Sequence, residues 1–176
     1  MHITAQEEYG LRCLLRVAGH SSEEPMRTQE VAEAEGLSLE YAAKLMRILK
    51  MGGLVVSTRG AAGGYVLARP AAEVTVWDAL EVLGGPLYTE SFCDQHTGSQ
   101  TDCTNHDAGC SLKTLWNSVN AILRASLSAI TLAELRGDAG SKWAWLVRSS
   151  DAAAAEAARV QARSTGSLTE RGGVTR

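Results

Sequence analysis

The sequence lacks any long uninterrupted apolar run. Its opening apolar stretch from Leu11 to Ala18 is broken by Arg12 and Arg16. A secretory signal needs a continuous apolar core of about 7–15 residues, and a membrane-spanning helix needs about 20. We therefore expect neither a signal peptide nor a membrane span, no membrane partner, and a cytoplasmic location.

The 176-residue chain also lacks the motifs of an enzyme. It has no glycine-rich phosphate-binding loop, no ordered catalytic triad and no Cys-x-x-Cys pair. A thiol oxidoreductase that used Cys103 or Cys110 as its nucleophile would need an identifiable base and a substrate pocket, and the sequence indicates neither. We therefore expect no enzymatic activity.

The chain as a whole has no excess of positive charge, because its formal net charge is −3. The charged residues are distributed unevenly: residues 38–69 contain five basic residues and a single acidic one, Glu40. A basic cluster of this kind is typical of a surface that meets a phosphate backbone. The length corresponds to about one domain with an appended element.

Three helices are predicted in the first 51 residues. Apolar spacing indicates helices over 4–19 and 39–51. Thr28 is the expected N-cap of a short helix between them, which runs to Ala34. Ser38 is the expected N-cap of the third helix, which turns four side chains inward: Ala42, Leu45, Met46 and Leu49.

A β-hairpin is predicted next, with strands over 54–58 and 65–68 joined by a glycine-rich turn. Thr75 is the expected N-cap of a fourth helix that ends at Leu83. This order of elements, with basic residues on the third helix and the hairpin, is typical of a winged helix-turn-helix. We expect a mainly α fold with a small β-hairpin, in which residues 1–86 form a winged helix-turn-helix DNA-binding domain.

A second apolar stripe begins at Ser111. Large apolar residues recur at three- and four-residue steps through Leu127, as in a long amphipathic helix. A stripe that extends beyond a small domain predicts a dimerisation helix, and hence a homodimer. A capping-box spacing after it predicts a short terminal helix, so that residues 111–137 form one region. Residues 138–176 form a C-terminal tail that we expect to be partly disordered.

Three of the four cysteines lie within eighteen residues, in a polar loop over 87–110. Because cytosolic thiols are kept reduced, Cys93, Cys103 and Cys110 indicate metal or redox chemistry in preference to a disulfide framework. Thiolates suit iron–sulfur clusters and zinc alike, and gaps of nine and six residues are longer than those of a zinc knuckle. A regulatory disulfide is an alternative. The fourth cysteine, Cys13, lies among leucines and is expected in the core.

The candidate DNA contacts lie on the second and third helices and at the tip of the hairpin. The N-terminal residues of a recognition helix meet base edges, and an arginine at a wing tip can enter the minor groove. A glutamate accepts from cytosine, while lysine and arginine bind bases or phosphates. The alternative is that Tyr41 packs inward and that Lys44 and Arg47 are only solvated. The candidates are Thr28, Ser38, Glu40, Tyr41, Lys44, Arg47, Arg59 and Gly60.

The chain resembles the IscR, NsrR and RirA family of iron–sulfur transcription regulators over about residues 1–137. The segments that carry the resemblance are MHITAQEEYGLRCLLRVA, LSLEYAAKLMRILKMGGLVVSTRGAAGGYVLAR and CSLKTLWNSVNAILRASLSAITLAEL. The resemblance implies a dimeric, sequence-specific regulator of transcription that senses nitric oxide, redox or iron–sulfur status, with repression as the default. A cluster-free regulator on the same fold, which senses a thiol change or a small ligand, is the alternative.

The resemblance also implies a set of cluster ligands. Cys93, Cys103 and Cys110 take the places of the first, middle and third cluster cysteines. IscR-type members have a histidine ligand three residues after the last cysteine, where this chain has Lys113, and an ammonium is a poor ligand. NsrR-type members use a carboxylate from the first helix of the partner subunit, at the position of Glu8. We therefore expect three thiolates and Glu8 to hold a [4Fe-4S] cluster, in preference to [2Fe-2S].

The identity of the fourth ligand is open at this point. Glu8 could also be an ordinary exposed carboxylate favoured by the helix dipole. A hard oxygen should form the weakest bond to a soft cluster, and its loss would alter the spacing of the two recognition helices. The other donors in the loop are His96, His106, Asp94, Asp102 and Asp107.

Overall fold

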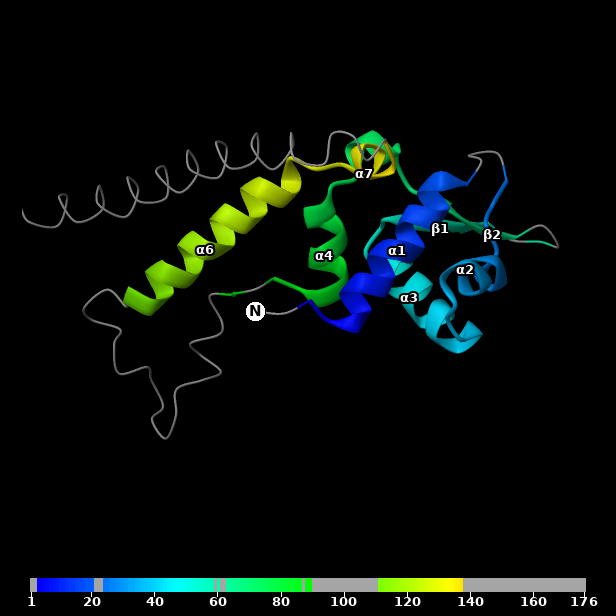
Figure 1. Ribbon diagram of the computed structural model, residues 1–176, viewed down its shortest axis with the longest axis horizontal. Coiled ribbons are helices and arrows are strands. Elements are labelled where there is room, and N and C mark those ends of the chain that lie inside the picture. Colours follow the sequence, from blue (N-terminus) through cyan, green and yellow to red (C-terminus); the bar gives the residue numbers. More distant parts are fainter. Residues whose placement is uncertain are drawn as a thin grey trace, which may run out of the picture. The chain divides into compact units, whose positions relative to one another are not determined.

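The computed structural model describes residues 3–20, 24–58, 60, 63–86, 88–89 and 111–137. The chain divides into two compact units: the first gathers Met1–Gly85 with Leu127–Lys142, and the second gathers Pro86–Ser126 with Trp143–Arg176. The described elements are helices apart from one two-stranded hairpin (Figure 1). The expected mainly α fold with a small β-hairpin is therefore confirmed.

Helix α1 (Ala5–Gly19) supplies one side of the core of the first unit. Its N-cap is Thr4, whose Oγ1 accepts a hydrogen bond from the backbone N–H of Glu7 at 3.2 Å. The Glu7 carboxylate in turn accepts from the backbone N–H of Thr4 at 2.7 Å, which completes a capping box. Cys13 lies on the buried face with no exposed surface, as predicted.

Helix α3 (Leu39–Met51) has the predicted bounds. Ser38 is its N-cap, because the Oγ of Ser38 accepts a hydrogen bond from the backbone N–H of Tyr41 at 3.2 Å. The four residues expected to face inward have no exposed surface: Ala42, Leu45, Met46 and Leu49. These side chains fix the helix against the core, so its outer face has a defined direction.

Helix α2 (Thr28–Glu35) begins one residue earlier than predicted. The N-cap is Arg27, whose backbone N–H donates to the Glu30 carboxylate at 2.7 Å, and Thr28 is the first helical residue. The prediction of Thr28 as the cap is therefore wrong. Glu30 satisfies the free N–H of Arg27, so no threonine hydroxyl is needed one position later.

Strands β1 (Val55–Thr58) and β2 (Gly64–Leu67) form an antiparallel hairpin, each within one residue of the predicted bounds. The segment before α2 pairs with it, because Met26 and Tyr65 exchange two backbone hydrogen bonds of 3.0 and 2.8 Å. A Cβ at Gly64 would lie 2.6 Å from the backbone oxygen of Met26, so this close approach requires glycine.

A short 3-10 helix, η1 (Ala71–Glu73), was not predicted and precedes α4 (Val76–Gly84). Thr75 is the N-cap of α4, as expected: its Oγ1 accepts from the backbone N–H of Asp78 at 3.1 Å. The predicted terminal helix is α7 (Leu132–Arg136), and its capping box is also present.

The start of α7 is paired with the start of α4. The backbone N–H of Val76 donates to the oxygen of Ile130 at 2.8 Å, and that of Leu132 donates to the oxygen of Val74 at 2.9 Å. The side chain of Leu132 is fully buried. Helix α7 therefore belongs to the first unit and completes its core, while the predicted domain boundaries stay predictions.

Helix α6 (Ser111–Ser128) is the long amphipathic helix expected from the apolar stripe. Several large apolar side chains on it are exposed, at fractions between 39% and 58%: Leu112, Leu115, Trp116 and Ile122. No helix in the described part of the chain combines the length and the apolar character that a membrane crossing needs.

Candidate nucleic-acid interface and cysteine region

The outer face of α3 brings together most of the predicted DNA contacts. Glu40, Lys44 and Arg47 are exposed on this one helix, and its N-cap Ser38 is exposed as well. Glu40, Lys44 and Arg47 lie on the side of α3 opposite to the buried residues described above, and Ser38 caps the N-terminus of this helix. The face thus presents one carboxylate and two cations on a rigid support, a set able to contact base edges and phosphates.

Tyr41 is half-buried and contacts α1. Its ring meets the ring of Tyr9 edge-to-face, with 6.3 Å between centroids and 80° between planes. The Lys44 Nζ lies 5.9 Å from the Tyr41 centroid, within cation–π range. Tyr41 therefore ties the start of α3 to α1 and holds the Lys44 ammonium, and a direct contact of its own with DNA stays a prediction.

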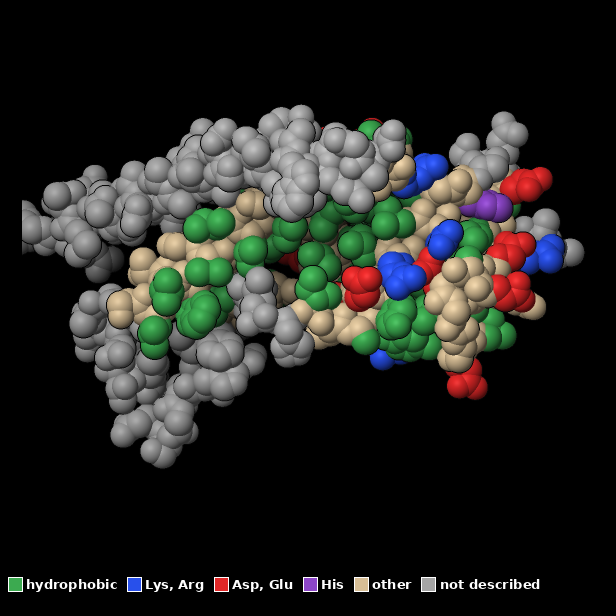
Figure 2. Space-filling model, viewed as in Figure 1, with side chains coloured by type: hydrophobic (Ala, Val, Ile, Leu, Met, Phe, Trp, Pro, Cys, Tyr) green, Lys and Arg blue, Asp and Glu red, His purple; other side chains and the backbone are tan. Residues whose placement is uncertain are grey.

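The carboxylate of Glu35, at the end of α2, joins that helix to α1. Its side chain is 2% exposed and accepts hydrogen bonds from the Nε of Arg12, at 2.7 Å, and from the Nε of Arg16. The Arg12 guanidinium also lies 5.5 Å from the centroid of Tyr9. Figure 2 shows basic and acidic side chains next to one another over α1.

Two opposing effects act on the pKa of Glu35. Burial is the largest single effect and raises the pKa, but the hydrogen bonds and the positive charges of Arg16 and Arg12 together lower the pKa by more. The net pKa is therefore below its ordinary value of 4.5. This group could not be predicted from the sequence, because no local spacing relates Glu35 to arginines 19 and 23 residues earlier.

The remaining predicted DNA contacts lie at the two flanks of α3. Thr28 is half-buried at the start of α2, and Gly60 is exposed in the hairpin turn with a φ of 113°, in the region that favours glycine. Lys50, near the end of α3, donates from its Nζ to the Oγ of Ser57 on β1 at 2.6 Å, which ties this helix to the hairpin. Arg59 lies outside the described residues.

Glu8 is exposed on the first turns of α1. Within the described part of the chain, its carboxylate has no hydrogen-bond or ion-pair partner, since Arg12, one helical turn later, is bound to Glu35. An exposed carboxylate without an ion-pair partner in the described residues is available as a ligand to a group held by another subunit. The choice of Glu8 over the loop donors stays a prediction.

The cysteine loop falls outside the described residues. This applies to the three predicted thiolate ligands, and equally to the alternative donors: Cys93, Cys103, Cys110, His96, His106, Asp94, Asp102 and Asp107. In the remainder, which the structure does describe, no group of three or more histidine, cysteine or acidic side chains could hold a metal ion. The ligand set and the type of cluster therefore stay predictions.

Cys13 is excluded as a reactive thiol by its surroundings. Burial, together with the nearby negative charge of Glu35, raises its pKa to about 11. A thiol with this pKa is almost entirely protonated at neutral pH, and the thiolate is the form that binds metals and attacks oxidants. Cys13 is thus a core residue, as predicted.

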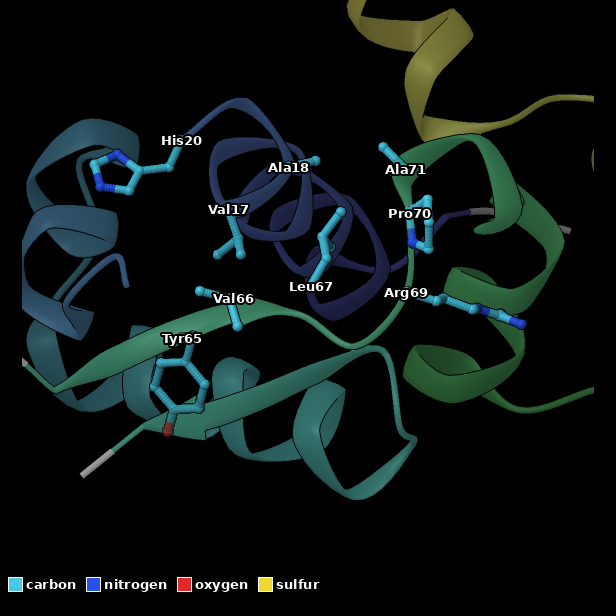
Figure 3. A pocket seen from close by; sticks show the side chains of 9 residues that line it. All are labelled: Val17, Ala18, His20, Tyr65, Val66, Leu67, Arg69, Pro70 and Ala71. Carbon is cyan, nitrogen blue, oxygen red and sulfur yellow. The ribbon is translucent and has the colours of Figure 1, made fainter. Parts of the chain in front are cut away.

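A depression with a cavity volume of about 470 Å³ lies between the end of α1 and strand β2 (Figure 3). Val17, from α1, and Val66 and Leu67, from β2, line the space between helix and strand. The positive charge of Arg69 at its edge is paired with Asp78 at 2.7 Å. The lining is mainly apolar and offers no nucleophile with an adjacent base.

Residues 3–138 match the Rrf2 family, described as iron-dependent transcriptional regulators. The chain belongs to the Rrf2 family. It is 36% identical over 142 residues to protein rrf2 of Nitratidesulfovibrio vulgaris (Hildenborough), covering 79% of this chain and 89% of that protein. It is 33% identical over 135 residues to the HTH-type transcriptional regulator IscR of Serratia proteamaculans, covering 77% and 79% of the two chains.

A solved Rrf2-type structure is similar as well. CymR (YrzC), the global cysteine regulator of B. subtilis, matches with a TM-score of 0.59 and 29% identity, over 77% of this chain and 95% of CymR. The expected family and winged-helix fold are confirmed by these similarities. Because the Rrf2 family consists of transcriptional regulators, the expectation that the chain is not an enzyme is confirmed too.

Proposed function

We propose that this Rrf2-family chain is a cytoplasmic homodimer that binds double-stranded operator DNA, represses transcription, and responds to nitric oxide, oxidants or iron supply through an iron–sulfur cluster. The observation that carries the DNA-binding part is the outer face of α3. Glu40, Lys44 and Arg47 are exposed on a helix whose opposite face has no exposed surface. A recognition helix needs this combination of rigid support and free polar side chains.

The roles on this face follow from the chemistry of each side chain. The Glu40 carboxylate accepts from the exocyclic amine of cytosine, while Lys44 and Arg47 donate to guanine or to phosphates. Arg59 would enter the minor groove from the tip of the wing, beside Gly60. Thr28 and Ser38 contact the backbone near the N-termini of their helices.

The proposed dimer interface is the apolar face of α6. Leu115 and Trp116 are 50% and 43% exposed, and Leu112 and Ile122 extend the same apolar surface. Figure 2 shows apolar side chains gathered over α6. A contiguous exposed apolar surface of this type marks a protein interface, and a two-fold interface uses the same surface on both subunits.

The proposed cluster is held by Cys93, Cys103 and Cys110 of one subunit and by Glu8 of the other, and is more readily a [4Fe-4S] than a [2Fe-2S] group. When bound, it supplies iron that reacts with nitric oxide and with oxidants. The carboxylate of Glu8 is the hard, weakly held ligand of this set. Its release would free the first turns of α1.

A contact path joins Glu8 to the DNA-reading face. Tyr9 follows Glu8 on α1, its ring meets the ring of Tyr41, and Tyr41 in turn holds Lys44. A shift of α1 at Glu8 would therefore act on the first turns of α3 through packed rings. We infer that loss of the cluster lowers operator affinity by this path.

Purification without oxygen tests the cluster. The wild type should be brown and contain iron and sulfide in stoichiometric amounts, and native mass spectrometry should identify the cluster by mass. Each of the substitutions Cys93→Ser, Cys103→Ser and Cys110→Ser should abolish iron binding. Glu8→Gln should speed cluster loss under nitric oxide, whereas Glu81→Gln, at an exposed acid on α4, should not. A Glu8→Gln protein that loses its cluster at the wild-type rate would exclude Glu8 as a ligand.

The alternative function is a regulator without a cluster that senses a thiol change or a small ligand. Its support is the similarity to CymR, a regulator whose described role concerns cysteine. The same preparation separates the two functions: a colourless, iron-free protein that binds DNA, and whose binding changes on thiol oxidation, would favour the alternative.

A further inference from the structure

Leu39 is an exposed leucine at the first position of α3. Its exposed fraction is 55%, whereas Ala42 and Leu45 on the same helix are fully buried. Its neighbours Ser38 and Glu40 are also exposed. Leu39 is therefore an exposed apolar side chain beside the polar outer face of the helix, and it is not part of the hydrophobic core cluster.

One helical turn later the outer face has a second small apolar side chain. Ala43 is exposed, and residues four apart on a helix lie about 5–6 Å from each other on the same side. Leu39 and Ala43 thus form a short apolar strip, which runs beside the polar row of Glu40, Lys44 and Arg47. The small size of Ala43 lets the helix approach a surface closely at this point.

The major groove contains one apolar group that such a strip can recognise. The C5-methyl of thymine projects into the groove, while every other base edge there presents hydrogen-bond donors or acceptors. The N-terminal turn of a recognition helix is the part that reaches the bases, and Leu39 is its first residue.

We propose that Leu39 recognises the 5-methyl group of a thymine in the operator, with Ala43 as the adjacent wall of the contact. This inference rests on the proposed function and adds a specificity residue to it. It assigns to the operator half-site at least one thymine that the hydrogen-bonding residues of the helix do not select. Burial of one methyl group against Leu39 is expected to change affinity about fourfold.

Deoxyuridine provides the probe, because it lacks only the methyl group and keeps every hydrogen-bonding atom of thymine. A duplex is first selected from random-sequence DNA with the wild-type protein, prepared without oxygen. Each thymine is then replaced singly by deoxyuridine, and the affinity of each duplex is measured for the wild type and for Leu39→Ala. Met51→Ala is the matched control, since Met51 is 79% exposed at the far end of the same helix.

For the wild type and Met51→Ala, the affinity should fall about fourfold when one or more thymines are replaced by deoxyuridine. For Leu39→Ala, the affinity should be the same for the thymine and the deoxyuridine duplex at those positions. The proposal is overturned if Leu39→Ala retains the wild-type sensitivity at every position, or if no replacement weakens the wild type. It is also overturned if Leu39→Ala lowers the affinity for every duplex, with or without deoxyuridine, by the same factor. Failure to enrich any duplex would instead refute the proposed DNA-binding function, and this inference with it.

Discussion

Replacement of Glu35 by glutamine should destabilise the first unit more than the same replacement at an exposed glutamate. The Glu35 carboxylate is 2% exposed and binds both Arg12 and Arg16. Removal of one partner from a fully buried pair costs about 3–5 kcal/mol. Here the two arginine side chains are 47% and 52% exposed, so water can solvate them once the charge is gone. We therefore expect a loss of about 2 kcal/mol at pH 7.

The pH dependence of this loss has a definite sign. The pKa of Glu35 is lower in the folded state than its ordinary value of 4.5, so its ionised form stabilises the fold fully above that value. The contribution disappears as the pH falls from there through the lower folded pKa. The stability of the wild type should consequently approach that of Glu35→Gln in acid, while the two remain separated between pH 6 and pH 8.

Urea unfolding at equal protein concentration, repeated from pH 8 downward, measures both effects. Glu33→Gln is the matched control, because Glu33 is an exposed residue of the same helix that accepts one hydrogen bond from Gln29. It should change the free energy of unfolding by less than about 0.5 kcal/mol. Equal losses for Glu35→Gln and Glu33→Gln, or a difference that does not narrow in acid, would refute the assignment of Glu35 as a buried link between α1 and α2.

Three further outcomes follow from the described residues. Cys13 should not react with iodoacetamide at pH 7.5 in the folded protein, because burial raises its pKa to about 11, and mass spectrometry should detect its alkylation only after unfolding. Gly64→Ala should cost about 2 kcal/mol in urea unfolding, since a Cβ would lie 2.6 Å from the Met26 oxygen and disrupt two hydrogen bonds, whereas Gly137→Ala should be nearly neutral. Trp116→Glu should weaken self-association at least about 30-fold in analytical ultracentrifugation, and Arg124→Glu, an exposed charge on the same helix, should not.

Local signals in the sequence were sufficient to predict most of the elements. Helix α3 has its predicted bounds because a serine cap precedes it, a glycine follows it, and four apolar residues at helical spacing enter the core. Helix α2 begins one residue before its predicted start, because the Glu30 carboxylate accepts a hydrogen bond from the backbone N–H of Arg27. This competition between a side-chain cap and a reciprocal carboxylate is not visible from composition alone.

Contacts between distant segments could not be predicted in the same way. The pairing of Met26 with Tyr65, and of Thr75 with Thr131, depends on how the first unit closes. The same is true of Glu35, whose two arginine partners lie on another helix. A single sequence contains no periodic signal for such pairs. The sequence alone also does not indicate whether Tyr41 faces DNA or the ring of Tyr9.

Leu39 could not be predicted as a DNA contact, because a leucine at the start of an amphipathic helix is as consistent with the core as with an exposed face. Its exposure of 55% is a property of the folded helix. For the cysteine region, the sequence provides a signal and the structure does not test it. Three thiolates within eighteen residues form a strong sequence pattern, and the resemblance supplies the hypothesis of a cluster, but these residues lie outside the described part of the chain.

The central claim is that a cluster in the cysteine loop controls how tightly the dimer holds its operator. Titration of one selected duplex with holo and apo protein, under anaerobic conditions at fixed salt concentration, tests it most directly. We predict that the holo form binds at least tenfold more tightly, and that nitric oxide lowers its affinity to the apo value. Equal affinities of the two forms, or a pure preparation without stoichiometric iron and sulfide, would contradict the claim.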